Sequence, residues 1–270
     1  FVDVEENSLG VDFKKLDNYL KKIAIIKNNK CYNKSSKRII KAIIVTHVYG
    51  HPCDLDYARK ISKKYKLILI EDAAEALGSF YKKKHVGTFG KMGVLSFNGN
   101  KIITTGGGGA ILVNDIKIAN KLNHISRNSR VKKNSWDYVH NELGFNYRLP
   151  SLNAQLGIAQ LKNLKMFIKN KRKLFKRYKK LLGNSKIFKI FEEPKNSKSN
   201  YWLNSIILNN PNRKLILNIL KQASRKKIQL RPVWQILSKN KYLRKFPKMK
   251  LDCALSLEKR ILNLPSSPNL

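Results

Sequence analysis

The sequence predicts an α/β fold with a mostly parallel central sheet, followed by a smaller C-terminal α+β domain. Residues 39–46 and Leu67–Ile70 are apolar, largely β-branched runs suited to buried strands. Between them, Leu55–Tyr65 has apolar residues at helical spacing and follows a capping aspartate, Asp54. A strand, helix and strand within about 30 residues form a βαβ unit, in which the two strands run parallel.

The later elements follow in order along the chain. We expect strands at 94–97 and 110–113, a helix capped by Asp115, a long amphipathic helix over 153–182 with lysines on its outer face, strands at 186–191 and 201–208, and a helix from Pro211 to near Lys227. We interpret the polar segment 195–200 as a loop. The pattern predicts two domains, residues 1–152 and 153–270.

The composition narrows the class of protein. The chain has no apolar run of the roughly 18 residues that a membrane helix needs, and no visible signal peptide. Its cysteines, Cys31, Cys53 and Cys253, lack CxxC spacing, which argues against disulfides and a metal site and fits a cytoplasmic protein. Because the chain begins with Phe1 and reads there like the middle of a domain, we expect an earlier N-terminal part to be missing.

The net charge of +39, from 56 Lys and Arg against 17 Asp and Glu, is typical of proteins that bind nucleic acid or an anionic surface. The lysines are, however, spread along the whole chain beside abundant Asn and Ile, as AT-rich coding would produce. No RNA-binding aromatic motif, zinc finger or Gly-Arg tract accompanies them. The pattern therefore disfavours a nucleic-acid role, although a basic surface would help to recruit an anionic small substrate.

The segment SFNGNKIITTGGGG, residues 96–109, places a single amine, Lys101, between two predicted strands. A lysine must be neutral to attack a carbonyl, and a segment of small residues can hold it away from bulk water. The glycines that follow let the backbone approach a ligand closely, and Ser96 offers a hydroxyl to a phosphate. The segment does not have the spacing of a P-loop.

Asp72 stands at the carboxyl end of a predicted strand, where α/β sheets bind their ligands. By itself it would be interpreted as a cap of the following turn. Together with Lys101 it makes the pair that pyridoxal 5′-phosphate (PLP) requires, a lysine for a Schiff base and an aspartate for the protonated ring nitrogen. We therefore predict PLP as the cofactor, with Lys101 and Asp72 as catalytic residues.

The chain also resembles a known family, the DegT/StrS group of sugar-nucleotide aminotransferases, which are fold type I PLP enzymes. The resemblance runs from Phe1 to the closing NLPSSPNL. It is carried by VTHVYGHPCDLD (45–56), IEDAAEALGS (70–79), GTFGKMGVLSFNGNKIITTGGGGAILVN (87–114) and YVHNELGFNYRLPSLNAQLGIAQL (138–161). A sister branch has His in place of the lysine and performs dehydration, so Lys101 implies transamination.

The resemblance implies roles for particular residues. Lys101 would bind PLP covalently and shuttle the proton, and Asp72 would pair with the pyridine nitrogen. Ser96 would bind the cofactor phosphate, and Asn146 would reach that phosphate from the partner subunit of a homodimer with shared active sites. Glu75, where many members have Gln, would lie near the O3′ oxygen of the cofactor.

The substrate that the resemblance implies is a nucleotide sugar. Residues 96–109, RPVW (231–234) and NLPSSPNL (263–270) are most similar to enzymes that aminate C4 of UDP-linked 4-keto-6-deoxy-N-acetylhexosamine. That branch serves nonulosonic acid pathways such as that of legionaminic acid, within surface polysaccharide or lipopolysaccharide biosynthesis, and glutamate is the group's usual amino donor. A GDP-linked 4-keto-6-deoxymannose, which gives perosamine, stays open as the rival substrate.

Further residues are candidates for substrate binding. Arg231 can bind the nucleotide diphosphate, because a guanidinium suits phosphate, or it can be an ordinary surface residue. His47 and Tyr49 can line the sugar pocket or form a packed pair at the sheet edge. Tyr147 and Arg148 can contact substrate or only shape the loop of Asn146.

Two alternatives to the enzyme stay open. The family's other phosphate contacts lie upstream of Phe1, so the chain can be a catalytically inactive fragment or a regulatory homologue of the same fold. The other alternative is a basic nucleic-acid-binding protein.

Overall fold

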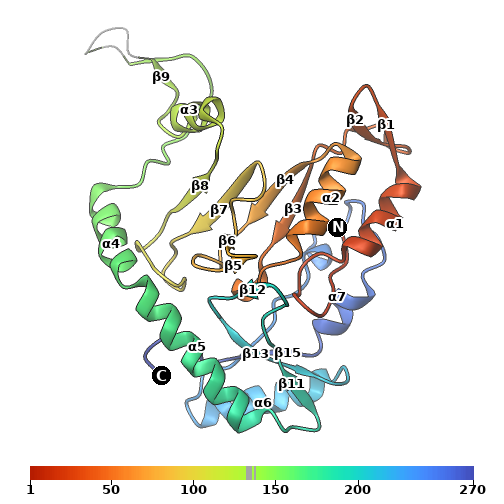
Figure 1. The fold of residues 1–270 in the computed structure, drawn as a ribbon, viewed down its shortest axis with the longest axis vertical. Coiled ribbons are helices and arrows are strands. Elements are labelled where there is room, and N and C mark those ends of the chain that lie inside the picture. Colours follow the sequence, from red (N-terminus) through yellow and green to blue (C-terminus); the bar gives the residue numbers. More distant parts are fainter. Residues whose placement is uncertain (132–135, 137) are drawn as a thin grey trace.

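The computed structural model describes residues 1–131, 136 and 138–270, and it is organised around two sheets (Figure 1). The central sheet has the strand order β3–β4–β7–β8, and the smaller sheet has the order β11–β13–β15–β14. No helix in the described part of the chain is long and apolar enough to cross a membrane.

The central sheet confirms the predicted α/β fold. Its strands are β3 (Ala42–Thr46), β4 (Ile68–Asp72), β7 (Met92–Ser96) and β8 (Gly109–Leu112). β4 runs parallel to both β3 and β7, and β8 pairs antiparallel with β7. The connection from β3 to β4 contains α2 (Leu55–Tyr65), and the carboxylate of Asp54 caps it by accepting the N–H groups of Asp56 and Tyr57. The predicted βαβ unit and its cap are therefore both present.

The two faces of the central sheet differ. α1 (Phe13–Ile23) and α2 cover one face, where their buried side chains join those of the strands in one apolar core (Figure 1). On the other face Ile44 is 62% exposed and Ile111 is 50% exposed. Strands of parallel sheets are usually buried on both sides, so this open apolar face is unusual for the fold.

The smaller sheet is antiparallel throughout and is built from β11 (Phe188–Ile190), β13 (Asn204–Leu208), β14 (Arg231–Pro232) and β15 (Ile261–Leu264). α6 (Arg213–Arg225) packs on it through Ile216, which is fully buried among apolar residues of the sheet and of α5 (Leu164–Leu182). The expected α+β texture is present, whereas the boundary after residue 152 stays a prediction.

The remaining elements are short or connect these layers. They are β1 (Ala24–Lys27), β2 (Lys30–Asn33), η1 (Val48–Gly50), β5 (Phe80–Tyr81), β6 (Lys84–His85), α3 (Ile116–Ile125), β9 (Arg130–Val131), β10 (Val139–His140), α4 (Ser151–Lys162), β12 (Ser197–Lys198), η2 (Leu237–Lys239) and α7 (Asp252–Leu257). α3 and β9 stand apart from the central sheet, and we call residues 115–150, where the structure describes them, the arm (Figure 1).

The prediction of one helix over residues 153–182 was wrong. α4 ends and α5 begins at Asn163, whose side-chain amide donates to the Ala159 carbonyl at 3.2 Å. That carbonyl is the one that the backbone N–H of Asn163 would use in a continuous helix. The N–H instead bonds to the Gln160 carbonyl at 3.0 Å. Competition from a short polar side chain therefore interrupts the helix.

A buried carboxylate, Glu71, fixes the loop that leads into β7. Glu71 is fully buried, and its two oxygens accept the backbone N–H groups of Gly87, Phe89 and Gly90 at 2.6–2.7 Å. Burial alone would raise the pKa of Glu71, but hydrogen bonds from His47, Gly90 and Gly87 outweigh this and hold the pKa below its usual range. The ionised form therefore stabilises the fold.

Glu71→Gln is expected to lower the free energy of unfolding by roughly 2–3 kcal/mol at pH 7, because an amide cannot accept three N–H groups as well as a carboxylate can. The folded-state pKa is depressed, so the contribution of Glu71 is present above its unfolded-state pKa of about 4.3 and is lost as the pH falls through the folded value. Urea unfolding should show a constant difference between the two proteins above about pH 5 and a shrinking one below about pH 4.

The matched control is Glu192→Gln, which removes a half-exposed ion pair with Lys179. It should change the free energy of unfolding by less than about 1 kcal/mol. A difference between the Glu71 variant and the unmodified protein that does not depend on pH would contradict the assignment of an ionised, depressed Glu71.

Candidate active site

The predicted catalytic residues lie along one edge of the central sheet. Asp72 ends β4 and Ser96 ends β7, and these neighbouring parallel strands are in register with Asp72 opposite Val94. The chain leaves β7 through a loop that carries Lys101 and returns as β8. The carboxyl ends of parallel strands lie at the same edge, which is where α/β sheets bind ligands.

The amine of Lys101 is enclosed by an acid and an aromatic ring. Its Nζ atom lies 3.6 Å from Oε1 of Glu75 and 4.3 Å from the centre of the Trp202 ring, and the side chain is 14% exposed. The indole N–H of Trp202 also donates to the Asn100 carbonyl at 2.7 Å. Trp202 therefore covers the amine and fixes the backbone of the residue that precedes it.

Glu75 connects the amine to Asp72. Oε2 of Glu75 accepts the backbone N–H of Tyr49 at 2.8 Å. Burial raises the pKa of Glu75 above its usual value, and the charge of Asp72 adds to this effect, while the Tyr49 hydrogen bond and the charge of Lys101 oppose it without cancelling it. Asp72, Glu75 and Lys101 thus form one electrostatic cluster.

Asp72 also caps the turn that follows β4, as its position in the sequence predicts. Its Oδ1 atom accepts the backbone N–H of Ala74 at 3.1 Å, and Thr46 lies 3.5 Å from Oδ2. The aspartate therefore closes the turn after β4 and remains half-buried at the sheet edge.

The cluster fits PLP on three observations. The amine of Lys101 and the carboxylate of Asp72 stand at one sheet edge, and PLP needs an amine for its aldehyde carbon and an acid for its protonated ring nitrogen. A Cβ added at Gly99, which lines the cavity of Lys101, would meet nothing within 4 Å, so the backbone beside Lys101 leaves open space. The hydroxyl of Ser96 ends the adjacent strand. Lys101, Asp72, Glu75 and Ser96 are the residues of this chain that would hold the cofactor.

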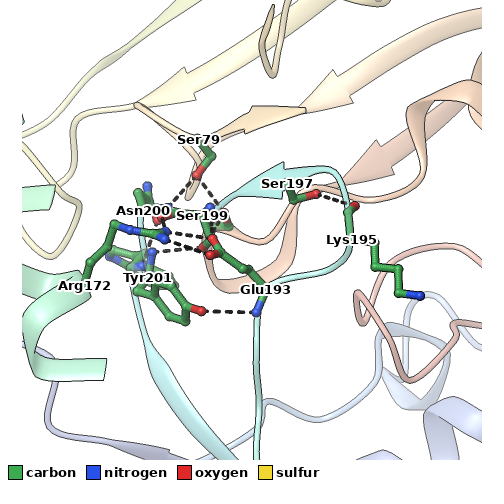
Figure 2. Close-up of polar contacts among 10 residues, drawn as sticks. Ser79, Arg172, Glu193, Lys195, Ser197, Ser199, Asn200 and Tyr201 are labelled. Carbon is green, nitrogen blue, oxygen red and sulfur yellow. Dashed lines mark hydrogen bonds and ion pairs between the residues drawn. The ribbon is translucent and has the colours of Figure 1, made fainter. Parts of the chain in front are cut away.

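A segment that sequence reasoning missed positions the turn of Glu75. The side-chain amide of Asn200 donates to the carbonyls of Glu75 and Leu77, both at 2.9 Å. Ser79 donates to the Gly50 carbonyl at 2.7 Å and accepts the backbone N–H of Asn200 at 2.9 Å (Figure 2). Asn200 sits so close that a Cβ at Gly50 would lie 1.8 Å from its Oδ1 atom. Within the polar loop 195–200, Ser199 and Asn200 are fully buried.

An ion pair holds that segment in place. The guanidinium of Arg172 on α5 contacts both carboxylate oxygens of Glu193 at 2.7 Å, and Glu193 accepts the backbone N–H of Ser199 at 2.7 Å (Figure 2). β12 adds backbone pairing with β5. Apart from the two residues of β12, segment 195–200 is the predicted polar loop, but its polar side chains bond to backbone groups from distant parts of the chain. No local pattern in the sequence signals this.

His47 and Tyr49 are both fully buried. Nε2 of His47 lies 3.2 Å from the carboxylate of Glu71, and its Nδ1 atom accepts the backbone N–H of Cys53. The Tyr49 ring packs 5.8 Å from the ring of Trp234. These contacts favour the packed pair at the sheet edge over two residues that line a sugar pocket, and Tyr49 reaches the site through its backbone N–H to Glu75.

Arg231 lies at the same cavity as Lys101. The cavity has a volume of about 960 Å³ and lies between the Lys101 loop and the smaller sheet. Trp202 and Trp234 form a stacked pair along it, with ring centres 6.2 Å apart and planes 10° apart. Arg213 and Arg231 contribute positive charge to its lining. The structure therefore places the candidate diphosphate residue in the cavity of the candidate catalytic amine.

The three predicted residues on the arm lie elsewhere. Asn146, Tyr147 and Arg148 are exposed, and Tyr147 stacks on Phe145 with ring centres 5.2 Å apart. Tyr147 and Arg148 line a second cavity, of about 850 Å³, between α3 and β8. Within one chain the described contacts do not bring these residues to Lys101.

Comparison with known proteins identifies relatives along the whole chain. The sequence model of the DegT/DnrJ/EryC1/StrS aminotransferase family matches residues 1–270. The GDP-perosamine synthase of Escherichia coli O157:H7 is 37% identical over 232 residues, which are 85% of this chain and 61% of that protein. The UDP-4-amino-4,6-dideoxy-N-acetyl-beta-L-altrosamine transaminase of Campylobacter jejuni strain 81-176 is 33% identical over 208 residues, which are 77% of this chain and 52% of that protein.

Solved structures show the same fold. Helicobacter pylori PseC, described as an aminotransferase involved in the biosynthesis of pseudoaminic acid, superposes with a TM-score of 0.88 at 24% identity and covers 100% of this chain and 68% of its own. A DegT DnrJ EryC1 StrS aminotransferase from Brucella abortus gives a TM-score of 0.85 at 24% identity, with the same coverage. The chain spans about half to three-fifths of the length of the curated relatives named above.

Glu75→Gln is expected to raise the free energy of unfolding of the cofactor-free protein at pH 7. The amide oxygen can still accept the Tyr49 N–H, whereas the buried charge beside Asp72 is removed. An acid whose pKa is raised by folding destabilises the fold once it ionises, so the stability of the unmodified protein falls as the pH rises past the usual Glu pKa of about 4.3. Unfolding midpoints measured from pH 3.5 to 7 should therefore converge at the acidic end.

Asp56→Asn serves as the control, because its ion pair with Lys82 lowers the pKa of Asp56 and the side chain is half exposed. This variant should be slightly less stable at pH 7 and not more stable. A Glu75→Gln protein that is less stable at pH 7 than at pH 4, relative to the unmodified protein, would show that Lys101 outweighs burial at this site.

Proposed function

Because the chain belongs to the DegT/DnrJ/EryC1/StrS aminotransferase family, we propose that it is a PLP-dependent aminotransferase acting on C4 of a nucleotide-linked 4-keto-6-deoxy sugar. The observation that carries the proposal is the enclosed amine of Lys101, 3.6 Å from Glu75, at the sheet edge where Asp72 ends its strand. When bound, PLP supplies an electron-accepting ring that stabilises negative charge on the carbon that loses its proton.

Each residue of the cluster has a defined task in this proposal. Lys101 holds the cofactor, and its Nζ atom moves the proton to and from the reacting carbon. Asp72 keeps the ring nitrogen protonated, and Ser96 binds the phosphate. Trp202 covers the amine of Lys101 and limits its contact with water. Glu75 orients the amine and accepts a hydrogen bond near the ring oxygen.

The proposed substrates follow from the relatives and the cavity. The names of the relatives contain a GDP-linked and a UDP-linked amino sugar. We favour the UDP-linked 4-keto-6-deoxy-N-acetylhexosamine of a nonulosonic acid pathway such as that of legionaminic acid, with L-glutamate as donor, and keep the GDP-linked sugar as the competing substrate. Arg231, in the cavity of Lys101, would bind the diphosphate through its planar guanidinium.

The proposal includes a homodimer in the cytoplasm. Asn146 would reach the cofactor phosphate of the partner subunit, which fits its place on the exposed arm. Large apolar side chains near it are open, including Leu143 at 81% and Leu152 at 82% exposure, and a second copy would cover them. Cys31, Cys53 and Cys253 are free thiols, which agrees with a reducing compartment.

The first test is spectroscopic. Titration of the protein with PLP should produce a visible absorbance band, and Lys101→Ala should abolish that band, since the covalent link is lost. With L-glutamate and the UDP- or GDP-linked keto sugar, the same variant should lower kcat by a factor of about 10³ or more.

Lys91→Ala, which removes a surface lysine paired with Asp115, should change neither measurement. A protein that binds PLP tightly but transfers no amino group would support the regulatory homologue instead. A protein that takes up no PLP would remove the catalytic proposal for this chain.

The shared active site is tested by mixing two inactive variants. Lys101→Ala and Asn146→Ala should each be inactive as pure dimers. If Asn146 acts across the interface, each mixed dimer has one intact site, so subunit exchange at equal amounts should restore about a quarter of the original activity. No recovery, in a mixture that demonstrably exchanges subunits, would place the action of Asn146 within its own chain.

A further inference from the structure

Lys171 is a buried cation on a helix whose other lysines face solvent. Its side chain is 5% exposed, whereas Lys165, Lys169 and Lys173 on α5 are exposed. The ammonium donates to the Trp202 carbonyl at 3.0 Å and to the Ser266 carbonyl. Lys171 also lines the cavity that contains Lys101. The sequence analysis counted Lys171 among the lysines on the outer face of the helix, and the proposed reaction has no role for it.

The charge of Lys171 has no counterpart within the described part of the chain. None of the ion pairs among described residues includes Lys171, and burial alone lowers its pKa to about 8, with no carboxylate opposing the shift. Burying an ion without an opposite charge beside it is energetically unfavourable. The described residues that line the cavity include no Asp or Glu, although Lys101, Arg213 and Arg231 are among them.

The hydrogen bonds of Lys171 are also incomplete. An ammonium group has three donors, and the two carbonyls account for two of them. The NH2 group of a neutral amide has two donors and could join the two carbonyls without the cost of a buried charge. A cation at position 171 is therefore favourable only if an anionic group enters the cavity and accepts a hydrogen bond from the third N–H of the ammonium.

We propose that Lys171 is an anion-binding residue of the Lys101 cavity and that it binds the diphosphate of a nucleotide-linked substrate. The inference rests on the proposed function and adds the group that neutralises the substrate's charge. A diphosphate carries more than one negative charge, which matches a lining with Lys171, Arg213 and Arg231 and no acid. The carboxylates of an amino donor offer the same oxyanion chemistry, so the test separates the two sources.

The test measures binding, without turnover, by titration calorimetry with UDP, GDP, uridine and L-glutamate. Lys171→Gln should weaken UDP and GDP binding by about 10- to 100-fold, the range for loss of one charge-assisted hydrogen bond, and should leave uridine binding unchanged. Lys171→Arg keeps the charge and should retain diphosphate affinity within about fivefold of the unmodified protein. If Lys171→Gln does not fold, Lys171→Met, which keeps the apolar stem, takes its place.

Tyr178→Phe is the matched control on the same helix. Its hydroxyl donates to the Pro265 carbonyl at 2.9 Å, so it fastens the same C-terminal segment as Lys171 without a charge. This variant should change neither UDP nor uridine binding. A similar loss of diphosphate affinity in Tyr178→Phe would show that Lys171 only holds the segment.

Three other results would overturn the proposal. These are an equal loss of UDP and uridine binding in Lys171→Gln, a loss confined to L-glutamate, and no binding of UDP or GDP by the unmodified protein. The outcome is independent of the PLP experiment. Charge-selective UDP binding in a protein without transaminase activity would support the anion site while the catalytic proposal failed.

Discussion

The parallel pairing of β3, β4 and β7 is the constraint on which the candidate site depends. Because the three strands run in the same direction, their carboxyl ends share one edge, and residues 26 positions apart along the chain, Thr46 and Asp72, become neighbours. Ser96 ends the next strand at the same edge. Glu71, one residue before Asp72, holds the loop into β7 and so keeps that strand in register. The chemistry of the edge is therefore a product of strand direction.

The smaller sheet and its connections complete the site. Asn200 and Trp202 come just before β13, yet Asn200 fixes the backbone of Glu75 and Trp202 covers the amine of Lys101. Arg172 of α5 anchors the segment through Glu193. A movement of the smaller sheet would consequently displace both neighbours of Lys101 at once. The region after residue 183 therefore lines one side of the cavity and also positions the amine of Lys101.

Charge has a different meaning at the surface and in the cavity. The surplus of Lys and Arg over Asp and Glu is spread over the whole chain, and most of these side chains are solvated. The cavity is lined by several basic residues and, among the described lining residues, by no acid, and one of the basic residues, Lys171, is buried. Only the second arrangement has an energetic cost that a bound anion would relieve. Total charge alone therefore says little about the partner of this protein.

Local patterns in the sequence determined the elements of the central sheet. The apolar runs, the Asp54 and Asp115 caps and the βαβ order were sufficient, because strand burial and helix capping act over a few residues. The pairing of Lys101 with Asp72 as a PLP site also came from the sequence, through the chemistry that those two residue types share and a family resemblance. Its residue roles remain proposals.

Tertiary structure decided the rest. It buried His47 and Tyr49, drew the polar segment 195–200 into the core and placed Lys171 in the cavity without a counter-charge. These outcomes depend on hydrogen bonds between buried polar side chains and partner groups. The spacing of apolar residues does not reveal those partners, and most of them are distant in the chain. The break of the long helix at Asn163 has a local cause, because it comes from a bond between residues four apart that the helical period did not reveal. Periodicity reports which side of an element is apolar, whereas the partner of a buried polar group is known only once the chain has folded.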